Sequence, residues 1–176
     1  MIEADYYAAP NCNAICSSGS GTPKANGTQE CECSVGLQAK VTVSEKDEGK
    51  DWTINDGNYG SYHIHYIKAS GSSNGYTFDI SYVYYTGTCY RNNPCPAPRT
   101  TISTSLLPTP TSKDSPVYKL RVTVNGKTAI ATMKPGKVGL GSKRYQYNAS
   151  WSYGTVDNYF GLKKGQSVSV QIDKIN

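Results

Sequence analysis

The alternation of apolar and polar residues constrains the fold of this chain more than any other feature. It is clearest in segments 118–124 and 127–133, where apolar side chains recur at every second position on both sides of Asn125 and Gly126. An Asn-Gly pair between two such segments is a strong signal of a β-hairpin with a two-residue turn. A period of two places one set of side chains on a buried face and the other in solvent. The sequence therefore predicts antiparallel strands.

The same period recurs along the chain and predicts most of the remaining strands. These segments are 37–44, 52–54, 62–67, 76–85, 100–106, 145–153 and 166–175. Between them, residue composition predicts a charged turn at 45–50 and a Ser- and Gly-rich turn at 70–75. Pro135 and Gly136 are expected to end the hairpin that contains Asn125 and Gly126.

About eight or nine strands separated by turn signals are typical of an all-β sandwich. We expect a disulfide-stapled antiparallel β-sandwich, either immunoglobulin-like or jelly-roll-like, with a β-barrel as the alternative. Residues 160–168, Phe-Gly-Leu-Lys-Lys-Gly-Gln-Ser-Val, resemble the penultimate turn and last strand of many extracellular sandwich modules. Residues 35–176 are expected to form one β domain. Residues 1–34 are expected to form an irregular cysteine-containing segment that packs on it.

An even number of cysteines in a small polar chain predicts a disulfide framework. Cys31 and Cys33 are separated by one residue, so a bridge between them would close a small, strained ring. They are expected to pair back to the first two cysteines, and the last two to close a local loop. Zinc bound by the first four is the alternative, although zinc knuckles favour C-x2-C pairs. The six cysteines are Cys12, Cys16, Cys31, Cys33, Cys89 and Cys95.

Disulfides form in oxidising compartments, so the protein is predicted to be secreted, extracellular or periplasmic. No apolar run reaches the roughly 20 residues that a membrane helix needs, and no membrane span is expected. The net charge is +5, but the lysines and arginines are spread along the chain without a run of five. Nucleic-acid-binding proteins gather such residues on one face, so no nucleic-acid partner is expected. Weak attraction to anionic polymers is compatible with the net charge.

The two histidines, His63 and His65, lie two positions apart in a predicted strand and therefore point to the same face. If Tyr62, Ile64 and Tyr66 face the core, both imidazoles reach solvent, and Asp79 of the next strand is expected on their face. Two imidazoles and a carboxylate can bind a divalent metal, and no other cofactor is expected. The imidazoles can also act as acid and base in phosphodiester cleavage. The third alternative is a pair of exposed polar side chains.

Tyrosine is unusually frequent, with 15 of the 176 residues, more than a core of this size needs. Exposed tyrosine and tryptophan stack on sugar rings and anchor protein interfaces. The alternative is that tyrosines are an amphipathic cover over a small sandwich. The candidate binding residues are Tyr82, Tyr84, Tyr85, Tyr90, Trp151 and Tyr153.

Three functional hypotheses follow from these features. The first is a secreted, non-catalytic recognition module that binds a glycan or a cell-surface protein through exposed aromatic residues. The second is a small secreted hydrolase, such as a nuclease, or a metal-binding protein, centred on His63 and His65. The third is a structural surface protein or a host-interaction protein. The sequence has no H-E-x-x-H, P-loop or G-x-G-x-x-G motif, which favours the first hypothesis.

Overall fold

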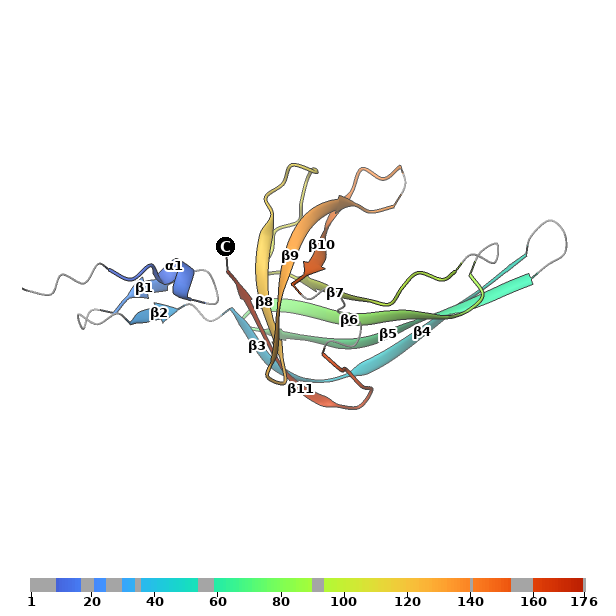
Figure 1. The fold of residues 1–176 in the computed structure, drawn as a ribbon, viewed down its shortest axis with the longest axis horizontal. Coiled ribbons are helices and arrows are strands. Elements are labelled where there is room, and N and C mark those ends of the chain that lie inside the picture. Colours follow the sequence, from blue (N-terminus) through green and yellow to red (C-terminus); the bar gives the residue numbers. More distant parts are fainter. Residues whose placement is uncertain are drawn as a thin grey trace, which may run out of the picture.

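The computed structural model describes residues 9–16, 21–24, 30–33, 36–53, 59–89, 94–139, 141–152 and 160–175, apart from the side chains of Glu32 and Cys33. Over these residues the protein is all-β, and two antiparallel sheets pack against each other (Figure 1). The predicted fold class is therefore confirmed. Two predicted binding residues, Tyr90 and Tyr153, lie outside the described residues.

One sheet has five strands in the order β10-β9-β8-β11-β3. The predicted hairpin is β8 and β9, and its turn residues Asn125 and Gly126 have φ angles of 47° and 80°, as a type I′ turn requires. The alternating residues Leu120, Val122 and Val124 are completely buried. The strands are β3 (Leu37–Thr42), β8 (Tyr118–Val124), β9 (Lys127–Lys137), β10 (Tyr145–Trp151) and β11 (Ser167–Lys174).

The other sheet has four strands in the order β4-β5-β6-β7. β5 and β6 join through Asn74 and Gly75, whose φ angles of 53° and 81° form a second two-residue turn. The turn predicted at 70–75 is therefore too long, because the ladder between the two strands continues to Ser73 opposite Tyr76. The strands are β4 (Ser44–Thr53), β5 (Tyr59–Ser73), β6 (Tyr76–Gly87) and β7 (Arg99–Thr104).

The charged turn predicted at residues 45–50 is wrong, because these residues belong to β4. This edge strand pairs one to one with β5, from Ser44 opposite Lys68 to Thr53 opposite Tyr59. Nearly all of its side chains are exposed, so both faces tolerate charge and the sequence lacks the alternation that identifies a strand. Charged side chains are also a common feature of edge strands, since they discourage pairing with other molecules.

The predicted end of the hairpin at Pro135 and Gly136 is also wrong, because β9 runs on to Lys137. The N–H of Ser152 donates to the carbonyl of Ile130, so even-numbered residues of β9 face β10. Residue 135 faces the side of β8, whose pairing with β9 ends at Met133. Proline therefore removes no bond from the ladder at this position.

The hydrophobic core lies between the two sheets, where Leu37, Ile80, Leu120 and Ile172 are completely buried. Val43 alone separates β3 from β4 and carries the chain from one sheet into the other. Its N–H donates to the carbonyl of Gln166 and its carbonyl accepts from the N–H of Gly165, both at 2.8 Å. The strands of the two sheets cross rather than run alongside each other (Figure 1).

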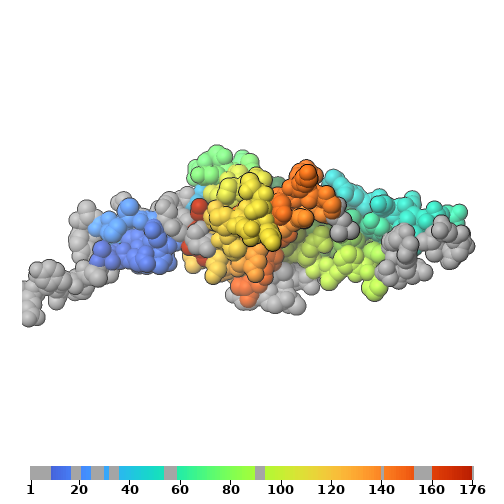
Figure 2. Space-filling model, turned by 90° about the horizontal axis from the view of Figure 1, so that it is seen from above, coloured from blue at the N-terminus to red at the C-terminus, as the bar shows by residue number. Residues whose placement is uncertain are grey.

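The four-stranded sheet continues past the five-stranded sheet, so that no strand of the five-stranded sheet, as far as the structure describes it, covers this part (Figure 1). We call this part, residues 45–53, 59–66 and 82–87, the arm. The space-filling view shows the arm reaching toward one end of an elongated molecule (Figure 2).

The cysteine-containing segment is more regular than predicted. It forms one helical turn, α1 (Cys12–Ile15), and a two-stranded sheet of β1 (Gly21–Pro23) and β2 (Cys31–Cys33). In Figure 1 these elements lie beyond the β3 end of the sandwich. The packing of this segment on the β domain stays a prediction.

The predicted disulfide framework is confirmed where its side chains are described. Cys12 pairs with Cys31, which bridges the helical turn to β2, and Cys89 pairs with Cys95 in a local loop. Cys16 is also disulfide-bonded. These bridges exclude a zinc site on the same sulfur atoms.

We predict that Leu120→Ala lowers the free energy of unfolding by about 2–5 kcal/mol, because it leaves a cavity at a completely buried position of the core. Urea unfolding followed by tryptophan fluorescence measures the change. Val117→Ala is the matched control: Val117 is 45% exposed, and its truncation should change stability by less than about 0.5 kcal/mol. Equal effects of the two substitutions would contradict the placement of the core.

Candidate functional site

The arm has two faces of different chemistry, and the pairing register assigns each side chain to one of them. The inner face continues the core face of the sheet. It carries Glu45, Asp47, Asp51, His63, His65, Tyr82, Tyr84 and Thr86. The outer face turns away from the five-stranded sheet. It carries Lys46, Glu48, Lys50, Tyr62, Ile64, Tyr66, Val83 and Tyr85, and continues to Lys68, Asp79 and Arg99.

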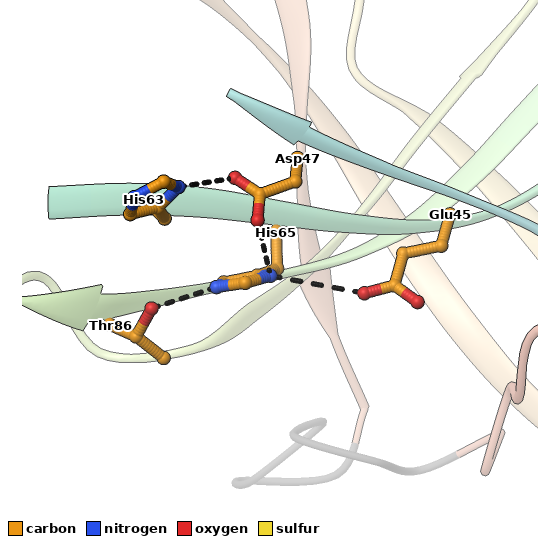
Figure 3. A network of polar contacts seen from close by, with 5 residues as sticks. All are labelled: Glu45, Asp47, His63, His65 and Thr86. Atoms are coloured by element: carbon orange, nitrogen blue, oxygen red, sulfur yellow. Dashed lines mark hydrogen bonds and ion pairs between the residues drawn. The ribbon is translucent and has the colours of Figure 1, made fainter. Parts of the chain in front are cut away.

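On the inner face, one carboxylate lies between the two histidines (Figure 3). Oδ1 of Asp47 is 2.8 Å from Nδ1 of His63, and its Oδ2 is 3.5 Å from Nδ1 of His65. Oε1 of Glu45 lies 3.8 Å from the same His65 nitrogen. Nε2 of His65 is 2.8 Å from the hydroxyl oxygen of Thr86. The cluster thus connects all three strands of the arm.

The two histidines differ in their surroundings. His65 is largely buried and stacks on Tyr84, with ring centroids 4.5 Å apart and ring planes 10° from parallel. The side chain of His63 is 53% exposed. When Nδ1–H of His63 donates to Asp47, its Nε2 is the nitrogen left to accept a proton, which is the arrangement of a general base.

The predicted metal set is not assembled. Asp79 lies on the outer face, where its carboxylate accepts hydrogen bonds from the hydroxyls of Ser70 and Ser81 at 2.9 and 2.6 Å. Among the described residues, no group of three or more His, Cys, Asp and Glu side chains is arranged to hold a metal ion.

The condition that Tyr62, Ile64 and Tyr66 face the core is not met, and these residues form the centre of the outer face. The core phase of β5 is set by Ile67 and Ala69, which pack on the hydrophobic core. Residues 62, 64 and 66 have the opposite parity and therefore point the other way. The sequence did contain a signal of this orientation. The apolar residues Ile67 and Ala69 follow the histidines at odd-numbered positions, so the odd-numbered positions of this strand face the core.

The outer face is an open aromatic surface with basic margins. The rings of Tyr62 and Tyr85 lie 6.0 Å apart, and Tyr66 lies beneath the ammonium of Lys68 at 5.2 Å. These tyrosines and Ile64 are half-buried, and Val83 between them is 3% exposed.

Charge separates the two faces of the arm. The outer face carries four cations, Lys46, Lys50, Lys68 and Arg99, against the carboxylates of Glu48 and Asp79, a net charge of +2. The hydrogen bond to Glu48 raises the pKa of Lys46, which further favours its charged form. The inner face carries three carboxylates, those of Glu45, Asp47 and Asp51, and its histidines when neutral add no charge.

The predicted aromatic binding residues do not form one surface. Tyr82 and Tyr84 lie on the inner face with ring centroids 5.7 Å apart, whereas Tyr85 lies on the outer face. Trp151 is on β10, where its Nε1–H donates to the carbonyl of Thr100 at 2.9 Å and its ring meets the edge of Phe160.

One sequence motif of hydrolases occurs in the chain outside the structural setting that the motif needs. Residues 71–75 spell G-x-S-x-G, the sequence of a nucleophile elbow. They occupy the end of β5 and the hairpin turn, whereas a nucleophile elbow joins a strand to a helix.

No family model, no curated protein and no solved structure matches this chain. No helix among the described residues is long and apolar enough to cross a membrane. The function must therefore be inferred from the geometry of the arm.

We predict that His65→Ala lowers the free energy of unfolding by about 1–2 kcal/mol, because it removes both the stacked ring and the hydrogen bond to Thr86. His63→Ala removes one exposed contact and should cost less than about 1 kcal/mol. Urea unfolding of the two variants measures both effects. A larger loss for His63→Ala than for His65→Ala would refute this description of the cluster.

Proposed function

We propose that the protein is a secreted recognition module that binds an acidic glycan on the outer face of the arm. The observation that carries this proposal is the Tyr62 and Tyr85 pair on an open sheet surface with lysine and arginine at its margins. The disulfides support an extracellular site of action. This proposal keeps the recognition hypothesis and moves it to a different set of tyrosines.

The chemistry of the face suits a sugar polymer with carboxylate or sulfate groups. Tyrosine rings stack on the apolar faces of sugars and lose little conformational entropy when they do so. Lys50 and Arg99 provide cations on opposite sides of the tyrosine pair, where they can contact the acidic groups. The described part of this face is formed by neighbouring strands of one sheet without enclosing walls, so it fits an extended polymer better than a small molecule.

We predict that Tyr85→Ala weakens binding to an immobilised acidic polysaccharide, such as polygalacturonate or heparin, by about tenfold, since each lost stacking contact contributes about 1–1.5 kcal/mol. Lys50→Gln should weaken it less. Raising the NaCl concentration to about 0.5 M should release the protein, because exposed charge pairs are screened. Affinity electrophoresis or biolayer interferometry on the oxidised protein measures each effect.

The matched control is Tyr76→Ala, which removes a 41% exposed tyrosine at the β5–β6 hairpin, away from the tyrosine pair. It should leave binding unchanged. A neutral polysaccharide serves as the control for charge. Retention that is equally reduced by Tyr76→Ala, or that is equal on neutral and acidic polymers, would reject the outer face as the site. Retention only on a cell-surface protein would replace the glycan with a protein partner.

A second candidate function, hydrolysis by acid–base catalysis, is favoured by one observation. Asp47 holds Nδ1 of the exposed His63, so the cluster has the geometry of an oriented general base. Turnover of a phosphodiester or ester substrate that falls at least about 100-fold in His63→Gln, with stability unchanged, would support this function. Absence of turnover in the unsubstituted protein, or equal turnover in the variant, would eliminate it.

A further inference from the structure

Two sheet edges face each other across a groove on the side of the sandwich. β7 is an edge of the four-stranded sheet and β10 is an edge of the five-stranded sheet (Figure 1). The groove between them has a volume of about 650 Å³ and is lined by residues 99–102 and 146–151. Trp151 spans one end of it through its hydrogen bond to the carbonyl of Thr100.

The backbone of β10 directs one row of hydrogen-bonding groups into this groove. The N–H of Ser152 donates to the carbonyl of Ile130 in β9, so the backbone groups of even-numbered residues of β10 face β9. Backbone groups in an antiparallel strand alternate between its two sides. The N–H and carbonyl groups of Tyr145, Tyr147 and Ala149 therefore point to the open edge. The same alternation applies to β7. The N–H of Ser105 donates to the carbonyl of Thr77 next to β6, so the backbone N–H and carbonyl of Ile102 point away from β6 and toward the groove.

The β10 strand itself carries none of the charges, prolines or bulges that commonly protect an edge from strand addition. Its seven residues, Tyr145–Trp151, include no charge and no proline, and the pairing with β9 continues without a bulge. β4, an edge of the four-stranded sheet, instead carries six charged residues among residues 45–51. Edges without such features are templates on which another strand can pair.

The walls of the groove are fixed before any strand arrives. The hydroxyl of Tyr147 donates to the carbonyl of Pro116 at 2.7 Å, and its ring meets the edge of Tyr118 at 5.6 Å. When the side chains beside an edge are already ordered, binding costs less conformational entropy, which favours addition of an extended peptide.

Residues 2–8 of the chain have an alternating sequence that suits an added strand. Ile2, Ala4, Tyr6 and Ala8 alternate with Glu3, Asp5 and Tyr7, which gives one mainly apolar set of side chains and one polar set with two carboxylates. The β10 edge has cations at both ends, Arg99 at one and Lys143 and Arg144 at the other. An extended segment with acidic outer side chains complements this charge.

We propose that residues 2–8 of a second copy of this chain add as a strand to the β10 edge, in the groove between β7 and β10. A second copy is the source because α1, which follows this segment, lies beyond the β3 end of the sandwich and away from β7 and β10 (Figure 1). The contact joins two different surfaces, so repeated addition forms open chains of molecules rather than closed dimers.

The first test is the mass of the oxidised full chain, measured by analytical ultracentrifugation over a range of concentrations. The proposal expects oligomers whose mass rises with concentration, and a monomer at all concentrations after deletion of residues 1–8. A synthetic peptide of residues 2–8 should bind the deletion variant and dissociate the oligomers of the full chain. A full chain that stays monomeric and a peptide that does not bind would overturn the proposal.

The second test separates backbone pairing from side-chain contact. Ala149→Pro removes an N–H that faces the groove and none that faces β9, and it should weaken peptide binding at least about tenfold. Ala149→Val keeps the N–H, adds a side chain of similar size, and should retain binding. Equal binding by both variants, with equal thermal stability, would reject strand addition.

The third test remains informative if proline at position 149 prevents folding. Lys143→Glu/Arg144→Glu should weaken binding of the peptide, and a peptide with lysine in place of Glu3 and Asp5 should restore it. These cations are not part of the proposed glycan face, so glycan binding should be unchanged. Failure of the exchanged charges to restore binding would show that charge does not select this peptide.

Discussion

The packing of Ile67 and Ala69 against the five-stranded sheet determines the arrangement of the whole arm. Because side chains alternate along a strand, the phase set in the core continues for as long as β5 stays regular. β5 runs from Tyr59 to Ser73 without an interruption of its ladder to β6. The packing of Ile67 and Ala69 on the core thus places both histidines on the inner face and Tyr62 and Tyr66 on the outer face.

The separation of charge between the two faces follows from the same phase. β4 contains acidic residues at odd positions 45, 47 and 51, and both of its lysines, Lys46 and Lys50, at even positions. Its pairing with β5 therefore places these unlike charges on opposite sides of one sheet. Each face then has its own chemistry. The carboxylates of Asp47 and Glu45 lie beside the histidines, whereas Lys50 and Arg99 flank the tyrosines of the outer face, where the proposal places an external anion.

Strands with one buried face could be predicted from the sequence, and strands with two exposed faces could not. β8, β9 and β6 show the period of two because the core selects apolar residues at alternate positions. β4 lies on the arm, where neither face is covered, so nothing selects an alternation and its charges were interpreted as a turn. Pro135 was misplaced for a related reason, because only the three-dimensional pairing shows which side of β9 lacks a neighbour.

The histidine pair was recognised from its spacing, but the residues that surround it were not. Asp47 contacts His63, and Thr86 contacts His65, because of the way the neighbouring strands pair with β5. The pairing of β6 with β5 depends on the two-residue turn at Asn74 and Gly75. The longer turn expected at 70–75 left this register undetermined. Asp79 was therefore assigned to the histidine face, although its pairing with Ser70 puts it on the other side.

The two proposed surfaces of this molecule can be occupied together. The glycan face belongs to the outer side of β4, β5 and β6, whereas strand addition uses the edge of β10 in the other sheet. Arg99 is the one residue assigned to both, since it ends the outer face and also lines the groove. Chains of molecules formed at the β10 edge would therefore leave the tyrosines of each copy exposed. Such repetition would convert several weak contacts to one polymer into strong attachment, because each bound copy raises the local concentration of the next.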